Sequence, residues 1–91
     1  MNFEWDSEKY KENIAKHGIA FEYATLVFDD PHNIKRIDDR RDYKEIRCQT
    51  IGNTGKHILF IVWTLRDGDI RIISARKANK KEQRIYNNED Y

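Results

Sequence analysis

The hydrophobic period of the chain changes once, near residue 32, and this change restricts the possible folds more than any other feature of the sequence. Before it, apolar residues recur at the spacing of an α-helix. After it, apolar and polar residues alternate with a period of two, which is typical of β-strands that bury one face. Helices followed by strands with short connections predict an α+β fold.

Two helices are predicted in the first part of the chain. Asp6 is a good N-cap for the first helix, and Gly18 supplies the left-handed residue that commonly ends one. The second helix ends before Pro31, and its start is poorly marked because Ala20 stands where a capping Ser, Thr or Asp is expected. Its apolar stripe consists of Phe21, Ala24, Val27 and Phe28.

Three or four antiparallel strands are predicted after residue 32. The candidate ranges are 33–38, 45–51, 57–65 and 70–77, with a charged loop over 39–42. The third range is apolar on both faces, which indicates a central strand. Asp67-Gly68 favours a type I′ hairpin, and strands joined by such short turns run antiparallel. Residues 3–5 form either a short strand or a hydrophobic staple. We expect the helices to cover one sheet face and leave the other at least partly open.

The last predicted strand leads into a short, highly charged helix. Asn79 begins this helix, and Glu82 three residues later completes an arrangement close to a capping box. Residues 71–84 include six basic residues and one acid, in a chain whose formal net charge is only +1. The basic residues are Arg71, Arg76, Lys77, Lys80, Lys81 and Arg84. Such a cluster is either a polyanion-binding surface or a solvated helix face.

The composition bounds the class of protein. The 91 residues suit one domain, over 1–91. Charged residues make up 36% of the chain, but two Trp, five Tyr and four Phe argue against disorder. Cys48 has no cysteine to pair with, and no metal-ligand spacing surrounds it. The longest apolar run, 58–63, is too short to span a membrane. We expect a small cytoplasmic protein without a metal or another cofactor.

The candidate site residues follow from the arginines of the strands. Arg47 lies at an outward position of its strand, whereas strict alternation places Arg71 and Arg76 on opposite faces, and the pattern does not indicate which of the two faces the core. Cleavage of RNA without a metal needs such groups, because charge develops on the phosphoryl oxygens as the 2′-hydroxyl attacks. Guanidinium groups bind these oxygens in pairs, and His, Glu, Lys or Tyr can transfer the protons.

Each candidate also has a structural explanation. His17 is suited to cap the end of the first helix, and the Tyr86 ring is suited to pack under the last one. Glu45 and Arg47 fit an ordinary pair on a strand surface. Trp5 is better explained as a core anchor than as a platform for stacking bases.

Two motifs, over 16–22 and 71–78, are specific in both order and spacing. Together with residues along nearly the whole chain they form one pattern: Phe3-Glu4-Trp5-Asp6, Asn13, Lys16-His17-Gly18-Ile19, Phe21-Glu22, Ala24, Phe28, Asp30-Pro31, Glu45-Ile46-Arg47, Ile51-Gly52, Thr64, Arg71-Ile72-Ile73-Ser74-Ala75-Arg76-Lys77-Ala78, Glu82 and Tyr86. In these residues the chain resembles the BrnT toxin family. Two positions depart from the family pattern: Ala20 replaces a usual capping residue, and Trp63 stands where a Tyr is common.

The resemblance implies a RelE-like fold and a type II toxin, a small ribonuclease that cuts RNA and inhibits translation. It also implies a BrnA-like antitoxin, a DNA-binding ribbon-helix-helix protein that covers the active face and carries the complex to its operator DNA. The catalytic residues it implies are Arg47, Arg76 and Tyr86, with His17 and Glu45 as further candidates. The cations expected to bind RNA are Arg71, Lys77, Lys80 and Lys81.

Two other functions remain open at this point. The first is a binding module without catalysis, which a sequence pI of 7.9 allows because strong nucleic-acid binders are usually more basic. The second is a co-repressor that contacts DNA only within the antitoxin complex. Cleavage by the purified protein distinguishes the first from a ribonuclease, and operator binding by the toxin alone tests the second.

Overall fold

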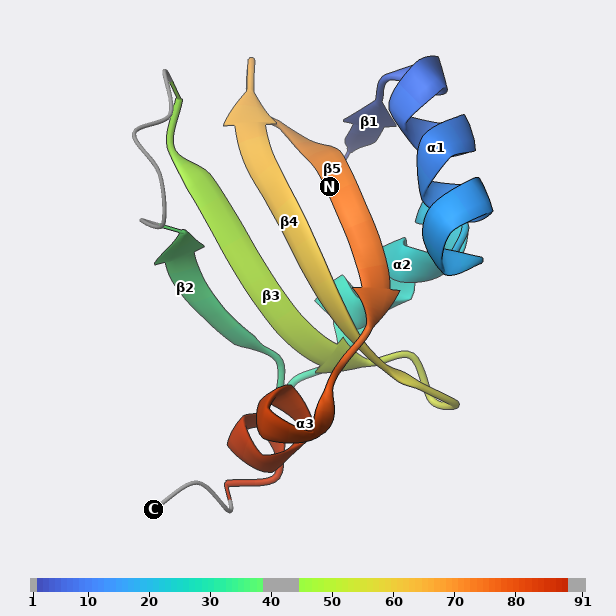
Figure 1. The fold of residues 1–91 in the computed structure, drawn as a ribbon. Helices are drawn as coiled ribbons and strands as arrows, with labels where there is room; N and C mark the ends of the chain where they lie inside the picture. Colours follow the sequence, from blue (N-terminus) through green and yellow to red (C-terminus); the bar gives the residue numbers. More distant parts are fainter. Residues whose placement is uncertain (1, 39–44, 89–91) are drawn as a thin grey trace.

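The computed structural model describes residues 2–38 and 45–88, and this part of the chain has an α+β fold (Figure 1). The elements follow in the order β1 (Phe3–Trp5), α1 (Ser7–His17), α2 (Phe21–Ala24), the 3₁₀-helix η1 (Thr25–Asp29), β2 (Ile34–Asp38), β3 (Arg47–Asn53), β4 (Ile58–Arg66), β5 (Asp69–Lys77) and α3 (Lys80–Tyr86). The predicted loop over 39–42 lies outside the described residues.

The described strands form a five-stranded mixed sheet in the order β1-β5-β4-β3-β2, which corrects the prediction of three or four antiparallel strands. β2 to β5 pair in antiparallel fashion, as predicted. β1 adds in parallel to the edge of β5, with Phe3 opposite Ile70 and Trp5 opposite Ile72. Three residues are too few to show a period of two. The long chain between β1 and β5 permits the parallel direction that a short hairpin excludes.

β4 and β5 form the hairpin that the Asp67-Gly68 dipeptide predicts. Both turn residues have positive φ, 52° and 84°, as a type I′ turn requires. β4 lies in the middle of the sheet and is buried on both faces, with Leu59 on one side and Phe60 on the other. The prediction of a central strand is therefore confirmed.

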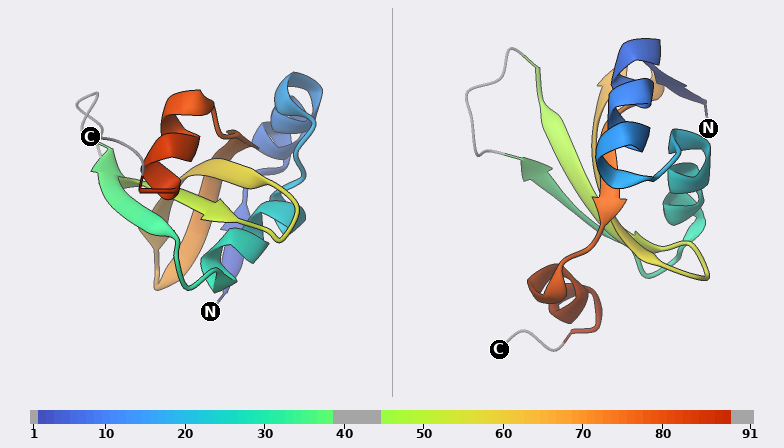
Figure 2. Two further views of the ribbon diagram at one scale, coloured as in Figure 1. Left: turned by 90° about the horizontal axis from the view of Figure 1, so that it is seen from below. Right: turned by 45° about the vertical axis from the view of Figure 1, so that its right-hand side comes forward.

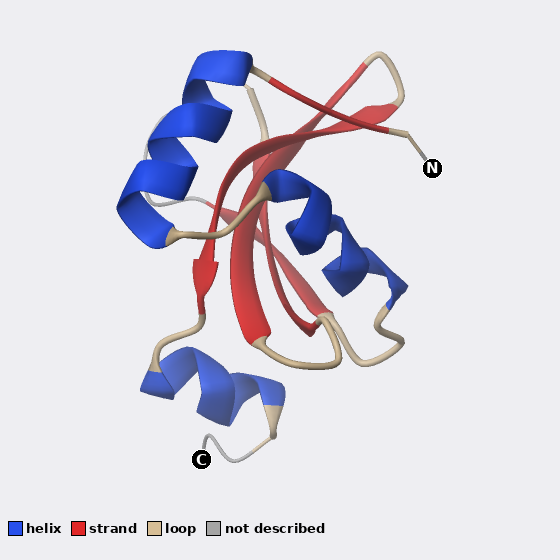
Figure 3. Ribbon diagram, turned by 90° about the vertical axis from the view of Figure 1, so that its right-hand side faces the viewer, coloured by secondary structure: helices blue, strands red, loops and turns tan. Residues whose placement is uncertain are grey.

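α1, α2 and η1 cover one face of the sheet (Figure 3). α1 has both predicted caps: Asp6 accepts a hydrogen bond from a first-turn backbone N–H at 3.0 Å, and Gly18 ends the helix with a φ of 69°. The predicted second helix is α-helical only over α2 and continues as the 3₁₀-helix η1. At this junction the Thr25 hydroxyl bonds back to the Glu22 carbonyl at 2.7 Å, which competes with regular helix bonds.

The main core lies between these helices and the sheet. The Trp5 ring packs against it, 5.8 Å from the Phe21 ring, which confirms Trp5 as a core anchor. The buried members of this core are Ile19, Phe21, Ala24, Val27, Leu59, Ile61, Trp63, Ile70, Ile72 and Ala75.

Asn13 of α1 completes the edge of β5 where β1 stops. β1 pairs with β5 only as far as Ile72, so the following backbone groups of β5 need other partners. The Asn13 amide donates to the carbonyl of Ala75 at 2.8 Å and accepts from the N–H of the same residue at 3.0 Å. It also donates to the Ile19 carbonyl at 2.9 Å. The side chain thus takes the place of a further strand residue and fixes α1 to the sheet.

β5 contains a bulge at Ile73. Val62 of β4 is opposite Ser74, while the next residue, Trp63, is opposite Ile72. Ile73 therefore has no partner on β4, and β5 has one residue more than its neighbour over this stretch. The bulge shifts the alternation of side chains along β5.

Because of this shift, the prediction that Arg71 and Arg76 lie on opposite faces is wrong. Arg71 is opposite Thr64 and Arg76 is opposite Phe60. Thr64 and Phe60 are four residues apart on one strand and so share a face. The bulge supplies the extra residue that brings both arginines to that face.

α3 lies on the other face of the sheet, which corrects the prediction that the helices share one face. Its capping box is formed as predicted, by Asn79 and Glu82. Ile85 and Tyr86 pack on a second core, because β3 and β4 are also apolar on this side; its buried members are Ile51, Phe60 and Val62. Figures 1 and 2 show α3 only at the end of the sheet where β5 finishes. We call the sheet face that carries α3 the open face.

Candidate nucleic-acid interface

Five arginines from four of the described strands belong to the open face: Arg36 of β2, Arg47 of β3, Arg66 of β4, and Arg71 and Arg76 of β5. Their placement follows from the register, since each shares its face with the second core. The Arg36 Nε donates to the Gln49 side-chain oxygen at 2.7 Å, and the Arg76 guanidinium lies 4.4 Å from the centre of the Phe60 ring. This concentration of guanidinium groups suits an anionic ligand.

One set of residues in register crosses the whole open face, and we call it the charged row. From edge to edge it consists of Glu4, Arg71, Thr64, Arg47 and Asp38. The acids lie at the two ends and the bases flank Thr64, whose hydroxyl donates to a backbone carbonyl at 2.6 Å. Neighbouring strands are about 4.8 Å apart, so the Cα atoms of Arg47 and Arg71 are roughly 10 Å apart. Two side chains of this length can reach one phosphate.

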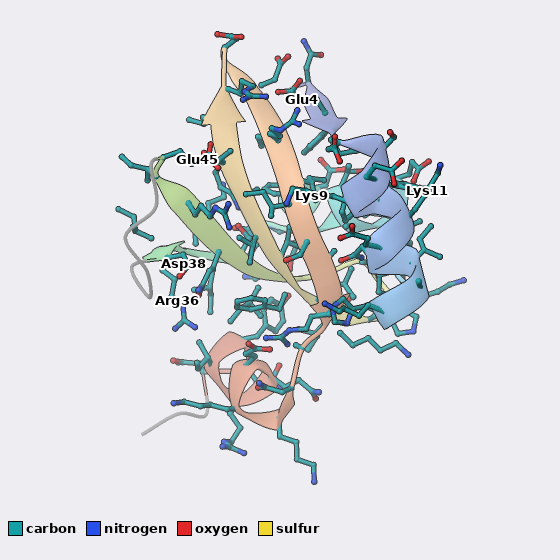
Figure 4. The ribbon with its side chains drawn as sticks, turned by 45° about the horizontal axis from the view of Figure 1, so that its top comes forward. Glu4, Lys9, Lys11, Arg36, Asp38 and Glu45 are labelled. Carbon is teal, nitrogen blue, oxygen red and sulfur yellow. The ribbon has the colours of Figure 1, made fainter. Side chains whose placement is uncertain are left out.

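The two arginines of the charged row each have a carboxylate nearby. Arg47 Nε is 3.5 Å from Glu45 Oε1, and Arg71 Nη1 is 3.7 Å from Glu4 Oε2. Figure 4 shows Glu4 on β1 and Glu45 before β3, at the end of the sheet away from α3. These four side chains are between 25% and 43% exposed. Ion pairs of such length and exposure contribute little to stability. The pair with Glu4 therefore leaves Arg71 accessible to phosphate oxygens.

Arg76 is held by α3. Its two terminal nitrogens bond both carboxylate oxygens of Glu82, at 2.8 and 2.9 Å. Glu82 is only 6% exposed and also accepts from the Asn79 N–H at 2.9 Å. Burial alone would raise the pKa of Glu82, but the hydrogen bonds from Arg76 and Asn79 outweigh it and lower the pKa. The paired, charge-assisted geometry makes this a strong attachment of α3 to β5.

Tyr86 is held at the other end of α3. Its hydroxyl donates to Asp30 Oδ2 at 2.6 Å, and the same carboxylate accepts from the backbone N–H groups of His32 and Asn53 at 2.9 and 2.8 Å. Burial and the bond to Asp30 raise the pKa of Tyr86 to about 12. Burial would also raise the pKa of Asp30, but its three hydrogen bonds lower it overall.

The remaining predicted residues lie outside the charged row. His17 is exposed at the end of α1 and lines a cavity of about 210 Å³ with Lys16 and Ser74 at the edge of β5. Glu45 lies beside the row through its contact with Arg47. The lysines expected to bind RNA are exposed at the end of β5 and the start of α3: Lys77, Lys80 and Lys81.

Sequence reasoning missed Arg36, Asp38 and Glu4. The first two alternate within the predicted strand 33–38, so the period of two already indicated that they share a face. No local signal identified Glu4, because its position depends on the parallel pairing of β1 with β5.

Within the described ranges, no group of three or more His, Cys, Asp or Glu side chains is placed to hold a metal ion. None of the described helices has the length and apolar character needed to cross a membrane.

A small α+β protein with an arginine-lined sheet face has the surface needed to bind a nucleic-acid backbone. Residues 5–82 match the model of a family described as the ribonuclease toxin, BrnT, of type II toxin–antitoxin systems. The protein therefore belongs to the class of ribonuclease toxins of type II toxin–antitoxin systems, which act together with an antitoxin. The chain belongs to the BrnT family, which confirms the resemblance seen in its motifs. Comparison with curated protein sequences gives no match.

Proposed function

We propose that this ribonuclease toxin cleaves RNA without a metal ion, at the charged row of the open face. The observation that carries the proposal is the register that places Arg47 and Arg71 on either side of Thr64. Guanidinium groups are always charged and can each bind two phosphoryl oxygens. A phosphate over Thr64 contacts both arginines, which then neutralise the charge that develops during cleavage.

The reaction begins with attack of the 2′-hydroxyl on the adjacent phosphorus. The two arginines bind the phosphoryl oxygens more strongly in the transition state, and loss of one such fixed donor typically costs about 10²–10³ in rate. Glu45 orients Arg47 through their 3.5 Å contact. The products are a 2′,3′-cyclic phosphate and a free 5′-hydroxyl.

Arg76 and Tyr86 have a different role in this proposal. The contacts of Arg76 with Glu82, and of Tyr86 with Asp30, attach α3 at two points. A pKa of about 12 also makes Tyr86 a poor base at neutral pH. We therefore propose that both residues position α3 beside the site. The exposed His17 and the lysines contact the RNA backbone; these are Lys77, Lys80 and Lys81.

The antitoxin is proposed to be a BrnA-like ribbon-helix-helix protein. It would cover the open face in the cytoplasm and carry the complex to operator DNA. Such a partner needs acidic side chains for the charged row, because the arginines lose water when they are covered.

The test uses the purified full-length protein and a single-stranded RNA in buffer with and without EDTA. We expect the same cleavage in both, with 2′,3′-cyclic phosphate and 5′-hydroxyl ends. Co-purified antitoxin should abolish it. Cleavage that stops with EDTA would refute the metal-free mechanism. A folded protein that binds operator DNA with its antitoxin but never cuts RNA would favour the co-repressor function.

A further inference from the structure

Glu4 is an unassigned carboxylate at the β1 end of the charged row. β1 pairs with β5 so that Glu4 is directly opposite Arg71, while its neighbours Phe3 and Trp5 pack on the helix side. Its side chain therefore belongs to the open face, and Oε2 lies 3.7 Å from Arg71 Nη1. Oε1 is shielded from solvent and has no hydrogen-bond partner among the described residues. An acceptor in this state is costly unless another donor arrives.

Three other described carboxylates around the open face are already engaged. Glu82 bonds Arg76 twice and Asn79 once, and Asp30 accepts three hydrogen bonds. Asp38 is 4% exposed and has an interaction of its own. Glu45, which lies beside the row, is more exposed than Glu4 and is 3.5 Å from Arg47 Nε. Glu4 combines a partly exposed carboxylate with a position next to a phosphate-binding arginine.

The order of residues in the charged row suits displacement at phosphorus. Along the row come Glu4, then Arg71, then the position over Thr64, and then Arg47. The attacking and leaving oxygens must lie on opposite sides of the phosphorus. With the phosphate between the two arginines, one of these oxygens points toward Glu4 and the other toward Arg47.

We propose that Glu4 is the general base of the reaction and that Arg71 holds the phosphate beside it. The inference rests on the proposed function, RNA cleavage at this row. Glu4 Oε2, the carboxylate oxygen on the Arg71 side, accepts the proton of the 2′-hydroxyl as the bond from the 2′-oxygen to phosphorus forms. The bond to the 5′-oxygen breaks, and this oxygen leaves next to Arg47 and takes a proton from water. The proton on Glu4 then passes to solvent, so charge and protons balance.

The test compares Glu4→Gln, which keeps the shape of the side chain, with the wild type and with Glu8→Gln as a matched control. Glu8 is an exposed acid of α1, 74% exposed and 3.8 Å from Lys11. We expect kcat to fall about 10²–10⁴-fold in Glu4→Gln, the usual range for loss of a general base, with KM nearly unchanged. Glu8→Gln should behave as the wild type. Thermal unfolding of each variant confirms that it is folded.

A second variant, Glu4→Ala, separates catalysis from structure. Formate added to it should restore part of the lost rate, because a small carboxylate can occupy the vacated position and accept the proton. A purely structural Glu4 would give a lower melting temperature and no formate rescue. Wild-type cleavage that persists in folded Glu4→Gln would overturn the role of Glu4 alone. Wild-type protein without any cleavage would instead overturn the proposed function, and the role of Glu4 with it.

Discussion

Two arginines of β5, five residues apart, lie on the same face of the sheet in very different surroundings. Arg76 bonds both oxygens of buried Glu82 at 2.8 and 2.9 Å and lies against the Phe60 ring. Arg71 has the carboxylate of Glu4 at 3.7 Å, too far for a direct hydrogen bond. The same side chain thus fixes a helix at one end of the sheet and is available to a ligand at the other.

The comparison shows that charge alone does not identify a binding residue. A guanidinium whose donors are used by a buried carboxylate must break these bonds before it can bind a phosphate, and the buried acid is then left unpaired. A guanidinium in a long, partly exposed pair loses little when its partner is exchanged. We therefore expect changes at Arg71 to affect activity, and changes at Arg76 to affect stability.

Among the changes that test this comparison, Arg71→Ala should have the largest effect. RNA cleavage should fall about 10²–10³-fold, because a fixed donor to the phosphoryl oxygens is lost. The free energy of unfolding should change by less than about 1 kcal/mol, since the pair with Glu4 is long and partly exposed. Kinetics on a short RNA and urea unfolding measure the two quantities. Arg84→Ala, an exposed arginine of α3, is the control, and undiminished cleavage by folded Arg71→Ala would contradict the comparison.

Arg76→Ala should have the reverse profile. It leaves buried Glu82 without its ion-pair partner, and we expect a loss of about 2–3 kcal/mol in the free energy of unfolding. The double variant Arg76→Ala/Glu82→Gln should recover part of this loss, because Gln is uncharged and still completes the capping box. Urea unfolding of both variants provides the measurement. A stable Arg76→Ala protein with no cleavage would show instead that Arg76 is a catalytic residue.

Tyr86→Phe should cost less, about 1 kcal/mol, because it removes one partly exposed hydrogen bond to Asp30. The pKa of Tyr86 is raised from 10.0 to about 12. The protonated hydroxyl therefore contributes fully to the free energy of unfolding below pH 10, and this contribution is lost as the pH rises toward 12. The pKa of Asp30 is lowered from 3.8. The ionised carboxylate therefore contributes fully to the free energy of unfolding above pH 3.8, and this contribution is lost as the pH falls below 3.8. The stability difference between wild type and variant, measured by urea unfolding, should therefore vanish at both extremes. A constant difference across this range would refute the bond.

Lys80→Ala and Lys81→Ala should have the smallest effects. Both side chains are exposed at the start of α3, so stability should change by less than about 0.5 kcal/mol. Each lysine that contacts a phosphate should reduce the salt dependence of RNA binding by about 0.7 in the log–log slope. Fluorescence anisotropy at several salt concentrations measures this slope. An unchanged slope would remove these lysines from the interface.

Local signals predicted the elements that local chemistry determines. Asp6 and Gly18 fixed the ends of α1, Asp67-Gly68 fixed the hairpin, and the apolar run from 57 to 65 identified the central strand. The capping residues of α3 were found in the same way. In each case the residues that carry the signal are within a few positions of the structure they determine.

The features that sequence reasoning missed depend on distant pairing. β1 is a strand only because the edge of β5, more than sixty residues later, provides its partner. The bulge at Ile73 exists relative to β4, so counting along β5 alone gave the wrong faces for its arginines. The contacts that hold Arg76 and Tyr86 likewise come from elements that meet only in the folded chain. The candidate site was therefore predicted as a set of residue types, and its geometry was not.

The bulge also determines which kinds of mutation can alter the open face. Substitutions exchange side chains but keep the number of residues, so they cannot move Arg71 from one side of β5 to the other. Removing Ile73 would restore strict alternation along β5. The side chains on one side of the deletion, either those around Arg71 or those around Arg76, would then point to the opposite face of the sheet. Insertions and deletions are usually tolerated best in surface loops. Here one extra residue inside a strand decides whether Arg71 and Arg76 share the open face. The number of residues in β5 is therefore as important for the site as their identity.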